Sequence, residues 1–151
     1  MSDEIPGVRR IHHVGIVVAD LDAAVRRYRD DLGLPFDAVM ERPEDSVRLA
    51  FLWAGASKIE LLQPVGEGTG VARFLASRGE GLHHVCFEVA DVAGALARLV
   101  ATGYELIDAV PRRGAEGPVA FIHPRSTNGA LIELIEAPGG PAWEALGYVT
   151  M

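Results

Sequence analysis

The feature that most constrains this sequence is an internal repeat that covers most of its length. Residues 12–28 align without gaps to residues 83–99, at an offset of 71 positions, and eight of the 17 aligned residues are identical. The order of similar segments is kept downstream while loop lengths differ, so the chain is predicted to fold as two copies of one unit. The downstream matches are Ala50-Phe51 with Ala120-Phe121 and Ile59-Glu60-Leu61 with Ile132-Glu133-Leu134.

Each copy is predicted to form one strand, one helix and three further strands. In the first copy the β-branched run 11–18 predicts a strand, and Asp20 is expected to cap a helix that ends at Gly33. Asp91 and Gly103 bound the corresponding helix of the second copy. The sequence therefore predicts an α+β fold of two tandem βαβββ modules that form a curved mixed sheet, with the helices on its outer face. The remaining strands are expected near 36–41, 47–54 and 57–63, and near 105–110, 118–123 and 130–136.

The two modules are expected to form a single domain over residues 1–151. A short helix should join them, and Trp143 and Leu146 should pack the Gly- and Pro-rich tail onto the body. Apolar residues make up 49% of the chain, which is typical of a globular protein. The expected boundaries are about 10–64 for module 1, 65–81 for the linker helix, 82–137 for module 2 and 138–151 for the tail.

Charge and composition exclude several classes of function. The net charge of −7 gives no basic stripe for nucleic acid, and one cysteine allows no internal disulfide. No apolar run approaches the roughly 20 residues of a membrane helix, and the first ten residues lack the apolar segment of a signal peptide. A cytoplasmic protein with neither nucleic acid nor membrane as partner is therefore expected.

A pair of adjacent histidines begins each copy, and strand geometry distinguishes the two members of each pair. Alternate residues of a strand face the same side. The β-branched neighbours should pack against the helices, which places His13 and His84 on the opposite, cavity-forming face. His12 and His83 are then expected to support the other two or to lie at the surface.

Glu60 and Glu133 lie mid-strand between apolar residues, where a carboxylate is costly unless it is paired or binds a metal. Taken singly, a strand histidine is more commonly structural and a strand glutamate more commonly solvent-facing. The symmetric recurrence of all four favours a metal site inside the curved sheet. Two imidazoles and two carboxylates neutralise a divalent ion, and an octahedral ion would keep two positions for two oxygens of a substrate, which suits an enolate. The expected metal ligands are His13, Glu60, His84 and Glu133.

This pattern resembles the vicinal oxygen chelate superfamily, which contains glyoxalases, bleomycin resistance proteins and dioxygenases. Within it the chain is most similar to the methylmalonyl-CoA epimerase family, through residues 11–34, 57–92 and 121–136. The runs RGEGLHH and HPRSTNGALIEL are more specific than the ligand set. The resemblance implies a homodimeric isomerase that inverts C2 of the methylmalonyl group of a CoA thioester through a metal-chelated enolate. It also implies one divalent ion, with Co²⁺ as the first choice and Ni²⁺, Mn²⁺, Zn²⁺ or Fe²⁺ as alternatives.

Inversion needs two groups that handle protons, or one that can change face. Glu133 is one candidate, as a ligand that could also act as the base. Some family members carry a glutamate within the third strand, where this chain has Leu49. Glu44, at the preceding turn, is the candidate for the second catalytic role, although a turn position suits a solvated carboxylate as well.

Arg125 and Ser126 are the expected contacts of the acyl-CoA, since an arginine there offers a forked donor to carboxylate or phosphate. An exposed turn arginine is an equally good interpretation of Arg125. Arg113, together with Arg112, is a further candidate for the CoA phosphates.

Three rival functions fit the same fold. A glyoxalase I-type lactoylglutathione lyase would use the same four ligands on a hemithioacetal, although the epimerase-like linker argues against it. An extradiol dioxygenase would bind Fe²⁺ through two histidines and one carboxylate, so Glu60 would be superfluous. A metal-free small-molecule binding protein would need no ligand set at all.

Overall fold

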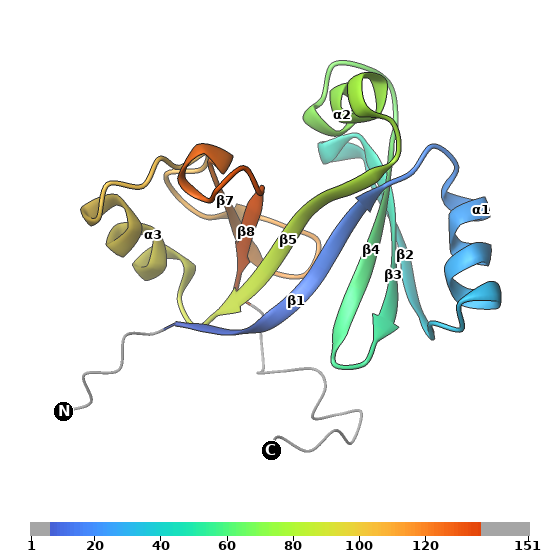
Figure 1. Cartoon of the computed structure of the whole chain (residues 1–151), viewed down its shortest axis with the longest axis horizontal. Coiled ribbons are helices and arrows are strands. Elements are labelled where there is room, and N and C mark those ends of the chain that lie inside the picture. Colours follow the sequence, from blue (N-terminus) through green and yellow to red (C-terminus); the bar gives the residue numbers. More distant parts are fainter. Residues whose placement is uncertain (1–6, 137–151) are drawn as a thin grey trace. The chain divides into compact units, whose positions relative to one another are not determined.

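The computed structural model describes residues 7–136 and divides the chain into two compact units. Of the described residues, 13–83 form one unit, called the first unit here, and 7–12 with 84–136 form the other, the second unit. The division crosses β1 (Val8–Val17) and β5 (Gly81–Val89), in each case between the two adjacent histidines. Each unit is built on a mixed sheet with a helix against one face (Figure 1).

The first unit has the strand order β1, β4 (Ser57–Pro64), β3 (Val47–Ala54) and β2 (Phe36–Arg42). β1 and β4 are parallel, whereas β3 is antiparallel to both β4 and β2. After β4 the chain forms α2 (Gly70–Arg78), which ends at Gly79 with φ +78°. This confirms a short helix within the predicted linker.

α1 (Leu21–Arg26) covers one face of this sheet, and the chain continues through a π-helical turn, η1 (Arg27–Asp31). Asp20 caps the helix by accepting a hydrogen bond from the backbone N–H of Ala23 at 3.1 Å. The first helical N–H, that of Leu21, donates to Gln63 Oε1 at 2.8 Å, which ties α1 to the end of β4. The buried core between helix and sheet comprises Val18, Leu21, Ala24, Val25, Ala50, Leu52 and Leu61.

The second unit repeats this plan in the order β5, β8 (Ile132–Ile135), β7 (Pro118–Ile122) and β6 (Arg112–Arg113). Asp91 caps α3 (Val92–Ala101) through the N–H of Gly94, and the N–H of Val92 donates to Glu136 Oε1 at 3.0 Å. We call the Gln63–Leu21 and Glu136–Val92 hydrogen bonds the helix latches. The core under α3 comprises Val89, Val92, Ala95, Leu96, Ala120, Ile122 and Leu134.

The α+β class and both βαβββ modules are therefore confirmed, and one predicted strand is wrong. Within residues 105–110, Leu106 forms only an isolated bridge to Ile122, and the pairing strand β6 begins at Arg112. The reason lies in Asp108, whose carboxylate accepts the backbone N–H of Phe121 at 2.8 Å in place of a ladder carbonyl. The single-domain assignment stays a prediction, and the proposed packing of Trp143 and Leu146 lies outside the described residues. Between residues 7 and 136, no helix has the length and hydropathy to cross a membrane.

Candidate functional site

In the first unit, His13 of β1 and Glu60 of β4 form a buried pair, with His13 Nε2 3.7 Å from Glu60 Oε1. Ile59 and Leu61, on either side of Glu60, pack in the core under α1. Strand alternation therefore turns Glu60 to the opposite face of the sheet, as the sequence predicted. Gly15 is the register partner of Glu60 on β1, so no side chain competes with the carboxylate there.

The second unit contains the same pair at the equivalent positions. His84 Nε2 lies 3.3 Å from Glu133 Oε1, and both side chains are buried. Ile132 and Leu134 pack in the core under α3, which again turns the glutamate away from the helix. Its register partner is Cys86, another small residue at the position equivalent to Gly15.

A phenylalanine stands beside each pair on the next strand. Phe51 is the register partner of Glu60, and its ring meets that of His13 edge-on, with centroids 5.9 Å apart. Phe121 is the register partner of Glu133 and meets His84 in the same way at 5.7 Å. Such edge-to-face contacts restrict how an imidazole can rotate.

Each of these two pairs fits a divalent metal ion by its chemistry. Each offers one imidazole nitrogen and one carboxylate oxygen within 4 Å of each other. Burying a carboxylate is costly, and a bound cation offsets that cost. Imidazole and carboxylate together suit the divalent ions from Mn²⁺ to Zn²⁺.

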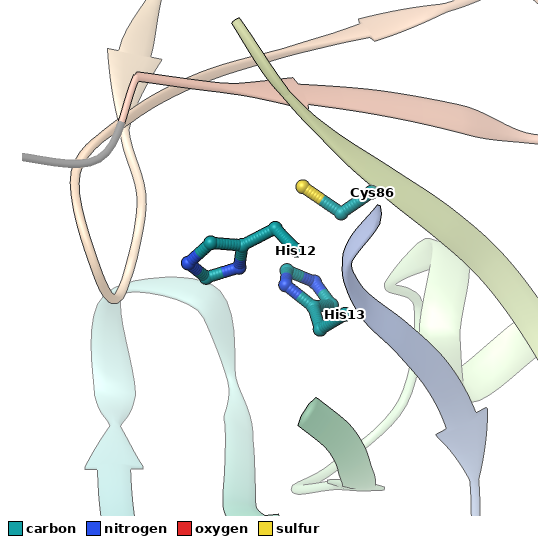
Figure 2. A group of neighbouring side chains, drawn as sticks. All are labelled: His12, His13 and Cys86. Carbon is teal, nitrogen blue, oxygen red and sulfur yellow. The ribbon is translucent and has the colours of Figure 1, made fainter. Parts of the chain in front are cut away.

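The other histidine of each doublet has a different environment. His12 is buried in the second unit, and its Nε2 lies 3.5 Å from Glu116 Oε2, so the surface alternative for His12 is wrong. Cys86 is fully buried against Val119 and Ile135, and its sulfur lies within 4.8 Å of a His12 ring nitrogen (Figure 2). Cys86 is therefore a small core residue of the second unit.

His83 lies in the first unit, where its ring packs edge-on against Phe74 of α2 at 5.1 Å. His83 therefore packs against the linker helix, α2.

Glu44, the candidate for the second catalytic role, lies in the turn η2 (Pro43–Asp45). Its side chain is 58% exposed, and Oε1 is 3.3 Å from Arg42 Nη2. Leu49 is buried in β3, two residues from Phe51 and therefore on the same face of the sheet. At this position the face thus has an apolar side chain and not a carboxylate.

The predicted acyl-CoA contacts lie in the turns of the second unit. Arg125, in η3 (Pro124–Ser126), is 74% exposed and pairs with Glu105 at 3.4 Å. The Ser126 hydroxyl accepts the backbone N–H of Glu105 at 2.9 Å, which fastens the turn. Arg113 is exposed on β6, opposite Pro118. The substrate-binding roles of these residues stay predictions.

Sequence reasoning missed Lys58, a buried cation on the same face of β4 as Glu60. Its Nζ lies 2.7 Å from Asp37 Oδ2 and 4.5 Å from the ring centroid of Trp53. The available signal was its spacing, because a residue two positions before Glu60 in a strand must share that face.

Comparison with known proteins settles the family. Residues 12–121 match the model of the glyoxalase/bleomycin resistance protein/dioxygenase superfamily. The chain belongs to this superfamily. The resemblance predicted from the sequence is thereby confirmed.

Relatives within the superfamily include epimerases and a lyase. An ethylmalonyl-CoA/methylmalonyl-CoA epimerase of Cereibacter sphaeroides is 42% identical over 130 residues, which is 84% of this chain and 97% of that protein. A Streptomyces coelicolor methylmalonyl-CoA epimerase, solved with 2-nitronate-propionyl-CoA, superimposes with a TM-score of 0.84 at 35% identity, covering 88% of this chain and all of that one. A lactoylglutathione lyase of Salmonella typhimurium is 29% identical over 129 residues, covering 85% of this chain and 93% of that protein.

Proposed function

We propose that this chain is a metal-dependent epimerase of methylmalonyl-CoA that interconverts the 2R and 2S forms by removing and returning the α-proton. The observation that carries the proposal is the buried His–Glu pair that recurs in both units, in a chain whose epimerase relatives align over most of its length. Two pairs of this kind supply four donors of the type that a divalent ion prefers.

The residues that would hold the ion are His13, Glu60, His84 and Glu133, with Co²⁺ as the first choice. A bound divalent ion supplies a Lewis acid that stabilises negative charge on a substrate oxygen. Ni²⁺, Mn²⁺, Zn²⁺ and Fe²⁺ suit the same donors. Analysis of the purified protein by plasma mass spectrometry identifies the metal that it carries.

The proton transfers are assigned to carboxylates of this chain. Glu133 is buried beside His84, so its carboxylate can act as the base that removes the α-proton. Return to the other face of the substrate needs a second group, for which Glu44 stays the candidate. Because Glu44 is exposed and held by Arg42, this role requires the turn η2 to bring it to the substrate.

The substrate contacts proposed for the acyl-CoA are Arg125 and Ser126, with Arg113 for the CoA phosphates. The first two lie on one turn of the second unit, and all three belong to segments near β7, the strand that carries Phe121 beside Glu133. We also propose that the protein is a cytoplasmic homodimer. Light scattering on the purified protein measures its mass and so tests the dimer.

The decisive experiment is α-proton exchange. Racemic methylmalonyl-CoA is incubated in deuterated water with the metal-loaded protein, and proton NMR follows loss of the C2 proton signal. We expect rapid exchange with the wild type and none above background with Glu133→Gln, whereas Asp30→Asn, an exposed carboxylate outside the proposed site, serves as a control with unchanged exchange. Absence of exchange with a protein shown to hold stoichiometric metal would refute the epimerase proposal.

The same preparation tests the rival functions. Formation of lactoylglutathione from the hemithioacetal of methylglyoxal and glutathione would favour the lyase, which the Salmonella relative makes the first alternative. Oxygen uptake with a catechol would favour a dioxygenase. Ligand binding by a protein that retains no metal would favour a metal-free binding protein.

A further inference from the structure

Both units place a cation against the phenylalanine that touches the candidate ligand histidine. In the first unit, Lys58 Nζ lies 5.1 Å from the ring centroid of Phe51, whose ring meets His13 edge-on. In the second unit, Arg112 Cζ lies 5.2 Å from the ring centroid of Phe121, which meets His84. The order cation, phenylalanine, histidine is therefore common to both.

An aspartate anchors each cation, and the two aspartates occupy equivalent positions of the repeat. Lys58 Nζ is 2.7 Å from Asp37 Oδ2, and Arg112 Nε is 3.4 Å from Asp108 Oδ2, at an offset of 71 residues between the aspartates. The cations themselves come from different strands, since Lys58 belongs to β4 and Arg112 to β6. The two units thus place a cation at the same position with residues from different strands. This recurrence argues that the arrangement has a functional role.

The two cations differ in burial. The side chain of Arg112 is 47% exposed, whereas that of Lys58 is 9% exposed and lies between Asp37, Phe51 and Trp53. A desolvated cation holds an aromatic face more strongly than an exposed one, and a buried ammonium that is fixed by a carboxylate has little freedom to move. Lys58 therefore restrains the ring of Phe51 more firmly than Arg112 restrains that of Phe121.

We propose that Lys58 is a positioning residue for the metal ligand His13 and acts through the ring of Phe51. Asp37 fixes the ammonium, the ammonium holds one side of the Phe51 ring, and Phe51 limits the rotation of the imidazole that must present its nitrogen to the ion. Groups that orient a ligand histidine commonly tune metal affinity. The inference rests on the proposed metal role of His13, and it assigns to Lys58 no contact with the substrate.

The test measures Co²⁺ binding rather than turnover. Isothermal titration gives the Kd for Co²⁺, and the visible absorption of bound Co²⁺ reports the geometry of its ligands. Lys58→Met should raise the Kd by about 3- to 10-fold and change the absorption spectrum. Arg48→Met is the matched control, because Arg48 is a cation of β3 that pairs with Glu41 and Asp22 and shares the helix-facing side of the strand with Ala50, opposite the side of Phe51. It should leave both readouts unchanged.

A double-mutant cycle with Phe51→Leu tests the route. If Lys58 acts through Phe51, the double variant should bind Co²⁺ about as weakly as Phe51→Leu alone, and multiplicative effects on Kd would overturn this route. Asp37→Asn keeps the ammonium and should raise Kd at least about 2-fold. It decides the matter if Lys58→Met does not fold, and an unchanged Kd would then refute the inference.

The outcomes separate this inference from the proposed function. A wild-type protein that binds no divalent ion would refute the metal-dependent function itself. A wild type that binds Co²⁺, with Lys58→Met binding it with the same affinity and spectrum, would refute the positioning role alone.

Discussion

Replacing Arg10 with methionine should destabilise the protein by about 3 kcal/mol, because it leaves the Glu88 carboxylate buried without its cation. Arg10 Nη2 lies 3.2 Å from Glu88 Oε1 within the second unit. The Glu88 side chain has no exposed surface, and that of Arg10 is 12% exposed. Methionine keeps the length and the apolar contacts of the arginine stem, so the charge is the main change.

The magnitude follows from the geometry. At 3.2 Å and an effective dielectric constant of about 20, Coulomb's law gives about 5 kcal/mol of attraction. Removing one partner of a buried pair typically costs about 3–5 kcal/mol. The lower end applies here because water reaches part of Arg10. For a chain of this length, about 3 kcal/mol corresponds to a fall in Tm of roughly 6–12 °C.

Urea denaturation followed by circular dichroism measures the loss. Glu88→Gln should cost less than Arg10→Met, because the charge that remains can turn toward water. The double variant Arg10→Met/Glu88→Gln should be more stable than Arg10→Met alone, since neither charge is then left buried. A loss below about 1 kcal/mol for Arg10→Met, or a double variant whose loss equals the sum of the two singles, would show that the pair does not compensate the burial of Glu88.

Two further predictions concern the caps and the metal. Asp20→Ala and Asp91→Ala should each lower the unfolding free energy by about 1 kcal/mol in urea titrations. Their effects should add, because the two caps lie in different units. A double variant whose loss departs from the sum of the two single losses would contradict this independence. Co²⁺ at about 100 times its Kd should raise the unfolding free energy by about 2.7 kcal/mol, and a chelator should reverse the gain. A Tm that is indifferent to both would count against a metal site in the folded protein.

Much of the fold could be predicted because the duplication tested each assignment twice. Asp20 and Asp91 were both expected to cap helices, and both accept the N–H three residues on. Alternate residues of a strand face opposite sides of the sheet. The apolar neighbours of Glu60 and Glu133, which face the helices, were therefore enough to predict that both carboxylates face the other side. The pairing of each glutamate with a histidine followed from their equivalent positions in the repeat.

The features that escaped prediction depend on side chains that replace backbone partners or reach across strands. The strand expected near 105–110 does not form, because the Asp108 carboxylate accepts the hydrogen bond from the backbone N–H of Phe121. The helix after Asp20 widens into π-helical geometry at Arg27, which no periodicity indicated. The cations beside Phe51 and Phe121 come from different strands, so alignment of the two copies could not reveal their common role.

The helix latches have a consequence for how the chain opens. In each module the first amide of the helix donates to a side chain at the end of the last strand, Gln63 within β4 and Glu136 just after β8. The residues that carry these amides, Leu21 and Val92, have no exposed surface. Their hydrogens can exchange with solvent only when that module comes apart. The two amides are therefore built-in reporters of local unfolding: equal exchange free energies mean that the duplicated halves open as one cooperative unit, and unequal ones mean that each half has kept its own folding equilibrium.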